Sequence, residues 1–357
     1  MTTSLSDRAA GAVVGALIGD ALGLGPHWYY DLAEMRHDYG DWITDYTDPK
    51  PNRYHAGLKA GDLSQTGLIT LELLRSVAAK NDYDQDDFTR RLDENILALT
   101  DGTPSSGPGG YTSISIRQLH KARVKKGIPW GQTGDYADTT EAAERAVVLA
   151  ARYASDVSHA ARVVVQNIHI TQIDPFVAAQ SVAFNVIVSS LVRGETFDEK
   201  LGRTLWKMIT KDTLPFTRVT LADEPQTPGV SFRPPSIELP FPDSLIYPFH
   251  ILRAAHDPDI RIEPAWKASL VYGLPCSINC MLPAAYYLAA RFPADFESAV
   301  LHALNGGGNN MSRAMLTGAL VGAMVGLSAI PKRFIAGLSG FDEIVELARE
   351  IGAQAAD

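Results

Sequence analysis

The side chains best suited to do chemistry lie in the segment LNGGGNNMSRA, residues 304–314. Its glycine triplet lets the backbone turn freely, and the residues that follow have the pattern of a helix start. Backbone N–H groups at such a start attract anions and polar ligands. Asn309, Asn310 and Ser312 add neutral donors and acceptors, so we expect them to contact a carboxylate, a phosphate or a sugar hydroxyl without a metal ion. Helix capping is the alternative role for these side chains.

Other candidates lie beside this segment and near the N-terminus. Arg313 could supply cationic charge to the same ligand through its fixed fork of donors, with a surface salt bridge as the alternative. In GPHWYYD, His27 could titrate near neutral pH, and Trp28 could form an aromatic wall against a flat or apolar group. Packing of the histidine against its aromatic neighbours is the alternative there.

A glycine-rich loop, SSGPGGY at residues 105–111, is a third candidate region. It is a flexible connection that leads into a helix. We expect Gly109, Gly110 and Tyr111 to contact the ligand, although any flexible connection has a similar composition.

Helical periodicity dominates the elements that must hold these residues. Apolar residues recur at spacings of three and four in residues 64–80, 86–100, 139–154, 174–192, 295–304 and 341–354. Start signals precede several of these segments, as at Thr139–Glu141, where an acidic residue falls in the first turn. Convincing strand alternation is absent from the sequence, so the predicted fold class is all-α.

Glycines recur every four residues in two apolar segments, at positions 11, 15 and 19 and again at 318, 322 and 326. Each glycine costs a helix about 1 kcal/mol, so such stripes indicate helices whose backbones approach closely. We predict that these two helices pack against one another.

We expect residues 1–357 to form a single domain with an irregular, proline-rich excursion at about 212–248. Eight of the 21 prolines fall between Pro215 and Pro248. The excursion could serve as a lid, an oligomer contact or simple packing.

Composition excludes several classes of function. The net charge is −9 and no basic cluster is present, so we expect no nucleic-acid or anionic-membrane partner. The apolar segments 9–25 and 314–330 are shorter than the roughly 20 residues of a membrane span. Cys276 and Cys280 are too few for a structural zinc site. The N-terminus lacks an export signal, so we expect a cytoplasmic protein.

Several segments together resemble the ADP-ribosylglycohydrolase family. GALIGDALGLGPHW is similar to the family's N-terminal helix end, GDLSQTGLITLELL to its first metal segment, and TQIDPFVAA to its T-H-x-D-P element. The stretch from Phe296 to Leu338 is similar to the family's second metal segment and the small-residue helix after it. The resemblance implies an orthogonal multi-helix bundle with a cleft for ADP-ribose and a dinuclear magnesium or manganese centre. It also implies that the glycine-rich loop wraps the ribose and diphosphate.

The departures from the family pattern fall on the metal ligands. Where the family has Thr-Asp-Asp, this chain has Ser64, Gln65 and Thr66; where it has Asp-x-Asp-Thr, this chain has Asn309, Asn310, Met311 and Ser312. His27 stands at the position of a family glutamate, and Gln172 at that of a histidine. Magnesium prefers carboxylate oxygens, so we expect no metal and no other cofactor, and we expect the exchanged side chains to contact the substrate.

Three functions remain open on these grounds. The first is a hydrolase that cleaves a glycosidic or other small-molecule bond without the dinuclear metal, with Asp62 and His27 as acid or base. Asp62 could instead only cap the following helix, and His55 is a further candidate, while Asp20 is expected to be a buried hydrogen-bonding residue. The second is a non-catalytic protein that binds ADP-ribose or another small molecule, or a structural protein like the crystallins. A metal-dependent hydrolase that uses Asp62 and backbone oxygens is a third possibility.

Overall fold

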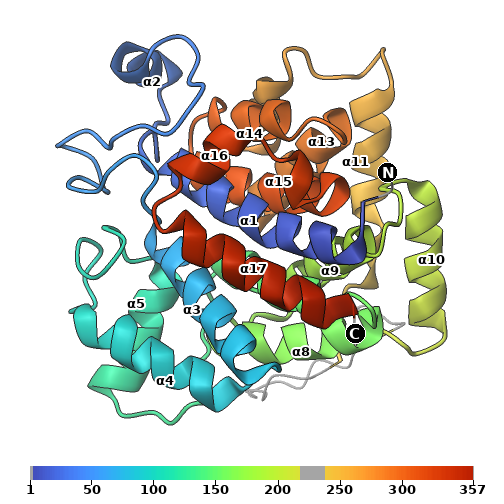
Figure 1. Ribbon diagram of the computed structural model, residues 1–357, viewed down its shortest axis with the longest axis horizontal. Coiled ribbons are helices and arrows are strands. Elements are labelled where there is room, and N and C mark those ends of the chain that lie inside the picture. The colour runs from blue at the N-terminus through green and yellow to red at the C-terminus, as the bar shows by residue number, and fades with distance from the viewer. Residues whose placement is uncertain (1–2, 218–237, 357) are drawn as a thin grey trace, which may run out of the picture.

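The computed structural model describes residues 3–217 and 238–356, and their fold is all-α, as predicted from the sequence (Figure 1). Within these ranges, β-type pairing is limited to four isolated bridges. The helices, in chain order, are α1 (Leu5–Leu24), α2 (Leu32–Tyr39), α3 (Gln65–Lys80), α4 (Gln85–Asn95), α5 (Ile114–His120), α6 (Glu141–Arg145), α7 (Val147–Arg152), α8 (Val157–Ile168), α9 (Pro175–Val192), α10 (Glu199–Thr210), α11 (Tyr247–His256), α12 (Ala268–Tyr272), α13 (Ile278–Arg291), α14 (Phe296–Leu304), α15 (Asn310–Val325), α16 (Lys332–Gly337) and α17 (Phe341–Ala356).

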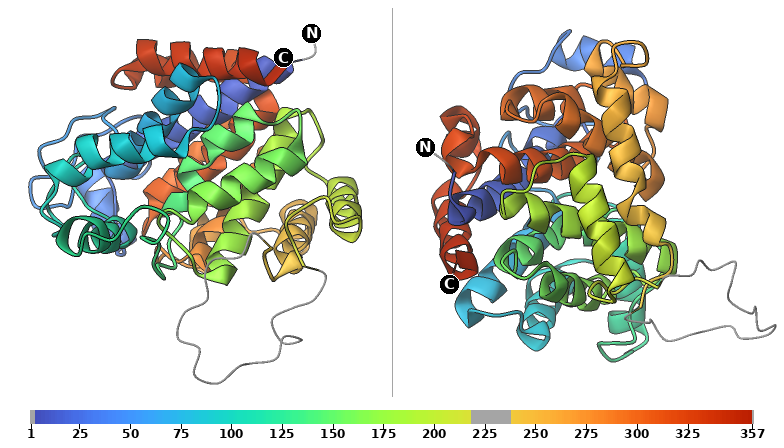
Figure 2. Two further views of the ribbon diagram at one scale, coloured as in Figure 1. Left: turned by 90° about the horizontal axis from the view of Figure 1, so that it is seen from below. Right: turned by 90° about the vertical axis from the view of Figure 1, so that its right-hand side faces the viewer.

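The predicted pair of glycine-striped helices is α1 and α15, which pack closely along their length. A Cβ atom added at Gly15 would lie 2.4 Å from the carbonyl oxygen of Gly318, and one added at Gly11 would lie 2.4 Å from that of Gly322. Backbone therefore touches backbone, which only glycine permits at this separation. Helix α17 packs across α1 on the outer face of the bundle (Figure 2).

One described helix, α9, is long and apolar enough to cross a membrane by length and composition alone. In this fold, 89% of its apolar window is buried among other helices. Asp174 caps its first turn, and Pro175 occupies the first helical position, where a missing N–H costs nothing. This helix packs as part of the protein core.

Loops from distant parts of the chain meet at the N-terminal end of α15. Gly308 donates to the carbonyl oxygen of Tyr29 (2.7 Å) and accepts from the N–H of Trp28 (3.0 Å). The N–H of Asn309 donates to the carbonyl oxygen of Leu274 (2.9 Å). Gly308 has a φ of +60°, and a Cβ there would lie 2.5 Å from the Leu274 carbonyl oxygen. The glycine triplet thus holds three loops together around one point.

The proline-rich excursion predicted at about 212–248 falls mostly on residues 218–237, which lie outside the described residues. Its role as a lid, a contact or packing stays a prediction.

Candidate functional site

A cavity of about 300 Å³ lies where the first residues of α3, α6 and α15 meet the loop after α1 and the start of α5. Nine of the residues proposed from the sequence line it: His27, Trp28, His55, Ser64, Gln65, Thr66, Tyr111, Asn309 and Ser312. The structure also places Ser113, Ile114, Arg117, Thr139, Glu141, Cys276 and Met311 on its walls. The two segments that differ from the family pattern therefore share one cavity.

Ser64 fixes the α3 side of the cavity. Its hydroxyl accepts from the N–H groups of Thr66 (3.1 Å) and Gly67 (3.3 Å), which caps α3, and donates to Asp20 Oδ1 (2.5 Å). Asp20 Oδ2 also accepts from the Ser64 N–H (2.8 Å). Burial raises the pKa of Asp20 to about 6, although the hydrogen bonds from Ser64 oppose this shift. Asp20 is thus a buried residue that ties α1 to α3, as expected.

Gln65 presents an unused acceptor on the same side. Its Nε2 donates to Thr112 Oγ1 (3.1 Å) and to the Pro108 carbonyl oxygen (3.4 Å). Its Oε1 is buried and has no hydrogen-bond partner among the residues that the structure describes. A buried acceptor without a partner costs free energy, so this amide is suited to receive a hydroxyl or N–H of a ligand.

On the α15 side of the cavity, the adjacent residues Asn309 and Asn310 have different roles. Asn309 caps α15 and donates through Nδ2 to Ser312 Oγ (3.0 Å), and both residues line the cavity. Asn310 is fully buried elsewhere, where Nδ2 donates to the carbonyl oxygens of Pro26 (3.0 Å) and Leu304 (3.2 Å). Ligand contact through the Asn310 side chain is therefore not supported, because that side chain ties the glycine loop to the end of α1.

Arg313 is also directed away from the cavity. It is fully buried and donates to the carbonyl oxygens of Ala303 (3.0 Å) and Gly307 (2.6 Å). Burial lowers its pKa to about 9. The expectation that Arg313 supplies charge to a ligand is not supported, since its guanidinium braces the glycine triplet from behind.

His27 and His55 form a hydrogen-bonded chain across the cavity wall. His27 Nδ1 lies 2.7 Å from His55 Nε2, and His55 Nδ1 lies 2.9 Å from the Gly109 carbonyl oxygen. His27 Nε2 lies 3.1 Å from Asn309 Oδ1. Gly109 was expected to contact the ligand, but it does not line the cavity, and its carbonyl instead orients His55.

Burial determines the protonation of the two hydrogen-bonded histidines, His27 and His55. It lowers the pKa of His27 well below its usual value and that of His55 to about 4, so both rings are neutral at pH 7. A carbonyl can only accept, so His55 carries its proton on Nδ1 and accepts from His27 through Nε2. His27 Nε2 is then an acceptor that faces Asn309. A neutral pair therefore requires the Asn309 amide to be turned from the orientation described above, so that its nitrogen donates to His27 Nε2 and its oxygen faces Ser312 Oγ.

Glu141 is the carboxyl group at the cavity that the sequence analysis missed. It is the first residue of α6, lines the cavity and accepts a short hydrogen bond from the Thr139 hydroxyl. Burial raises its pKa, and the hydrogen bonds from Thr139 and Ser115 oppose that shift. The segment TTEAAER was interpreted only as a helix start, but two glutamates three residues apart inside an apolar run could have marked a buried carboxyl pair.

Glu144 lies behind Glu141 and completes this pair. It is 1% exposed, and it is hydrogen-bonded by the hydroxyls of Thr140 and Ser312. Burial raises its pKa to about 8, and the charge of Glu141 contributes to that rise, because two neighbouring carboxylates repel each other. The pair therefore holds at least one proton at neutral pH, with Glu141 toward the cavity and Glu144 behind it.

Asp62 does not reach the cavity. Its Oδ2 accepts from the Lys59 N–H (2.8 Å) and its Oδ1 from the Ser339 hydroxyl (2.7 Å), at a partly exposed position. These bonds tie the loop before α3 to the loop before α17. The geometry gives no support to Asp62 as the acid or base of the site, and Glu141 is the carboxyl group that lines the cavity.

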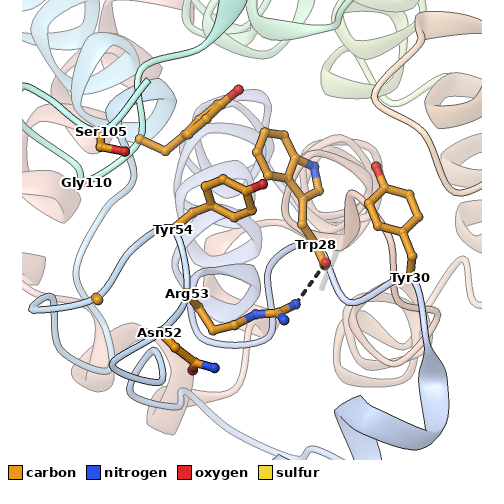
Figure 3. Close-up of a pocket in the computed structure, with 9 residues that line it drawn as sticks. Trp28, Tyr30, Asn52, Arg53, Tyr54, Ser105 and Gly110 are labelled. Atoms are coloured by element: carbon orange, nitrogen blue, oxygen red, sulfur yellow. Dashed lines mark hydrogen bonds between the residues drawn. The ribbon is translucent and has the colours of Figure 1, made fainter. Parts of the chain in front are cut away.

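An aromatic basin of about 940 Å³ lies outside the cavity (Figure 3). Trp28 and Tyr111 line both spaces, and Gly110 lines the basin. The ring of Trp28 meets those of Tyr54 and Tyr111 edge-on, with centroids 4.7 and 4.5 Å apart. A ligand larger than the cavity could therefore extend past Trp28 and Tyr111 onto aromatic surfaces.

The side chains at the positions where the resemblance places metal ligands are neutral. Ser64, Gln65, Thr66, Asn309 and Ser312 provide hydroxyl and amide groups, and several of these already bond to protein partners. In residues 3–217 and 238–356, no group of three or more His, Cys, Asp or Glu side chains is arranged to hold a metal ion.

Comparisons with known proteins agree with the fold and the motifs. The family model described as ADP-ribosylglycohydrolase matches residues 1–357. An uncharacterized protein of Archaeoglobus fulgidus is 23% identical over 349 residues, which cover 97% of this chain and 96% of that protein. A solved structure described as an ADP-ribosylglycohydrolase-related protein complex has a TM-score of 0.61 at 18% identity, covering 99% of this chain and 100% of that one, and so shares its fold. The chain belongs to the ADP-ribosylglycohydrolase family.

Proposed function

We propose that this family member is a hydrolase that cleaves a glycosidic bond of a small, ADP-ribose-like substrate in the 300 Å³ cavity without a dinuclear metal centre. The observation that carries the proposal is the convergence of Glu141, with Glu144 behind it, and the polar ends of α3 and α15 on that cavity. Convergence of titratable groups with shifted pKa values on one cavity is typical of active sites.

The donor set supports the metal-free part of the proposal. Two adjacent divalent ions need several carboxylate oxygens to offset their charge and dehydration. Glu141 is the single carboxylate among the residues that line the cavity, and the hydroxyl of Ser64 already serves Asp20 and the α3 cap. These residues do not fit a dinuclear magnesium or manganese site, so no step is assigned to a metal.

Glu141 is the acid and base in the proposed reaction. In protonated form it gives its proton to the leaving-group oxygen as the glycosidic C–O bond breaks. A water molecule then forms the new bond to the anomeric carbon and returns a proton to Glu141. Glu144 lies behind Glu141 and keeps its own proton at neutral pH, because burial and the charge of Glu141 raise its pKa to about 8.

The polar ends of the helices would hold the sugar. Gln65 Oε1 is free to accept from a hydroxyl, and Asn309 and Ser312 lie on the opposite segment of the cavity wall. Holding the sugar between these groups would place the glycosidic bond next to Glu141. Such positioning of the reacting groups lowers the barrier to the reaction.

The test is hydrolysis of an ADP-ribosylated peptide and of a nitrophenyl riboside, each in excess Mg²⁺ and again in EDTA. We expect equal rates in both solutions for the wild type. Glu141→Gln should lower kcat by about 10²–10⁴-fold, which is the usual contribution of a general acid or base. Asp62→Asn is the matched control, and its rate should stay close to that of the wild type because Asp62 lies outside the cavity.

The possible outcomes separate the alternatives. Activity that EDTA abolishes would overturn the metal-free proposal. Loss of activity in Asp62→Asn with retention in Glu141→Gln would restore the first assignment. Binding of ADP-ribose without turnover of either substrate would favour the non-catalytic binding protein.

A further inference from the structure

We infer that Arg117 is the recognition group for an anionic substituent, a phosphate or a carboxylate, on the molecule that enters the cavity. This inference rests on the proposed function for the location of the ligand, but it concerns binding and not bond cleavage. It assigns to α5 a charge that the sequence analysis expected from Arg313 on α15.

Arg117 lines the cavity and has no side-chain partner among the described residues. Its Nε is buried without a hydrogen bond, and its side chain forms no hydrogen bond or ion pair within the described parts of the chain. Arg313 and Arg145, which are both fully buried, do donate to carbonyl or amide oxygens. The guanidinium of Arg117 therefore remains available to a ligand.

The surroundings of Arg117 do not neutralise its charge. Glu141 lines the same cavity, but no ion pair joins the two within 4.0 Å, and the cation that most affects the Glu141 carboxyl is Arg145. Arg117 instead acts on the Tyr111 hydroxyl, whose pKa it lowers against the stronger effect of burial. The positive charge thus lies on the Tyr111 side of the cavity, where the cavity adjoins the basin.

A partly buried guanidinium without a partner carries a desolvation cost that an anion would offset. Its planar fork of donors matches the two oxygens of a carboxylate or phosphate, which a lysine cannot reproduce. On the same cavity wall, Gln65 Oε1 is a buried acceptor without a partner. One ligand that carries both a hydroxyl group and an anionic group would satisfy the two residues together.

The test compares the binding of ribose 5-phosphate with that of ribose by calorimetric titration of the full chain, without turnover. We expect the phosphate to increase affinity about tenfold or more, as a charge-assisted hydrogen bond contributes. Arg117→Met should remove this difference, and Arg117→Lys should restore only part of it. Arg162→Met is the control for net charge, because Arg162 is an exposed residue of α8, and it should bind like the wild type.

Competition by inorganic phosphate and by acetate distinguishes the two kinds of anion, and displacement by either supports the inference. The inference is overturned if a folded Arg117→Met variant still prefers ribose 5-phosphate, or if the wild type binds none of the three anions. Because no bond is cleaved, a protein that fails to hydrolyse any substrate but shows this preference would refute the proposed reaction and leave the role of Arg117 intact.

Discussion

At the scale of single residues, the site depends on which way each polar side chain turns from its backbone. Asn309 and Asn310 are adjacent and identical, but the helix start directs one side chain into the cavity and the other into the core. The same distinction separates Ser312, which lines the cavity, from Arg313, which does not. Residue type alone does not reveal this difference, because it arises from where α15 begins.

Glu144 gives a prediction for stability as a function of pH. Its pKa is raised from an ordinary value near 4.5 to about 8 in the folded protein. A carboxyl whose folded-state pKa is raised contributes stability that is fully present below about pH 4.5 and is lost as the pH rises through 8. Glu144→Gln keeps the shape and cannot ionise, so its melting temperature should increasingly exceed that of the wild type between pH 5 and pH 8.

The difference in melting temperature between Glu144→Gln and the wild type separates the effect of Glu144 from the effects of the other titrating groups. Asp20, with its pKa raised to about 6, loses stability over a lower range, and it does so in both proteins. His55, with its pKa lowered to about 4, acts in the opposite direction by destabilising the fold as the pH falls below 6.5. A constant difference in melting temperature between pH 5 and pH 8 would show that Glu144 ionises normally.

At the scale of elements, the α1–α15 pair fixes where the two altered segments lie. The loop after α1 carries His27, and the start of α15 carries Asn309, so close packing of the two helices brings these residues within hydrogen-bond distance. Gly15 and Gly318 lie in the middle of this contact, each with its carbonyl oxygen against the other helix.

Replacement of Gly15 by alanine tests that contact. In an ordinary helix the change stabilises by about 0.5–1 kcal/mol. Here the new Cβ would lie 2.4 Å from the Gly318 carbonyl oxygen, so we expect Gly15→Ala to lose about 1–3 kcal/mol in urea unfolding through overpacking. A stabilised variant would show that the two backbones are farther apart.

The sequence was sufficient to predict the elements with strong periodic signals. The four-residue glycine spacing predicted the α1–α15 pair, and the apolar periodicity predicted the all-α class. It was not sufficient for Glu141 or Arg117, which lie on α6 and α5, helices of five and seven residues. Such short helices carry little periodicity, and only tertiary packing brings their side chains to the cavity. The acidic start at Glu141 was recognised, but a helix-start signal and an active-site carboxyl look the same in one sequence.

At the scale of the whole molecule, the cavity and the basin adjoin at Trp28 and Tyr111, which line both of them. Tyr30 and Tyr54, each about half exposed, line the outer basin, whereas the Glu141 carboxyl lines the inner cavity. In Figure 3 the side chain of Trp28 lies between those of Tyr30 and Tyr54. A ligand with a polar sugar at one end and a flat group at the other would match this gradient from the inside to the outside.

Ligand binding at the cavity and the basin should change the thermal stability of the intact protein. A ligand that binds only the folded state stabilises it by RT ln(1 + [L]/Kd), about 2.7 kcal/mol at one hundred times Kd. If the proposed function holds, the cavity contacts its ligand through hydroxyl, amide and guanidinium groups, so we expect ADP-ribose to raise the melting temperature equally in excess Mg²⁺, in excess Mn²⁺ and in EDTA. The metals alone should leave the melting temperature unchanged, since Glu141 is the single carboxylate among the lining residues.

A further rise with metal would mean that Glu141 and its neighbours hold an ion after all. No rise with ADP-ribose in any solution would restrict the likeness to the family to its fold, and other small anions would then be the ligands to test.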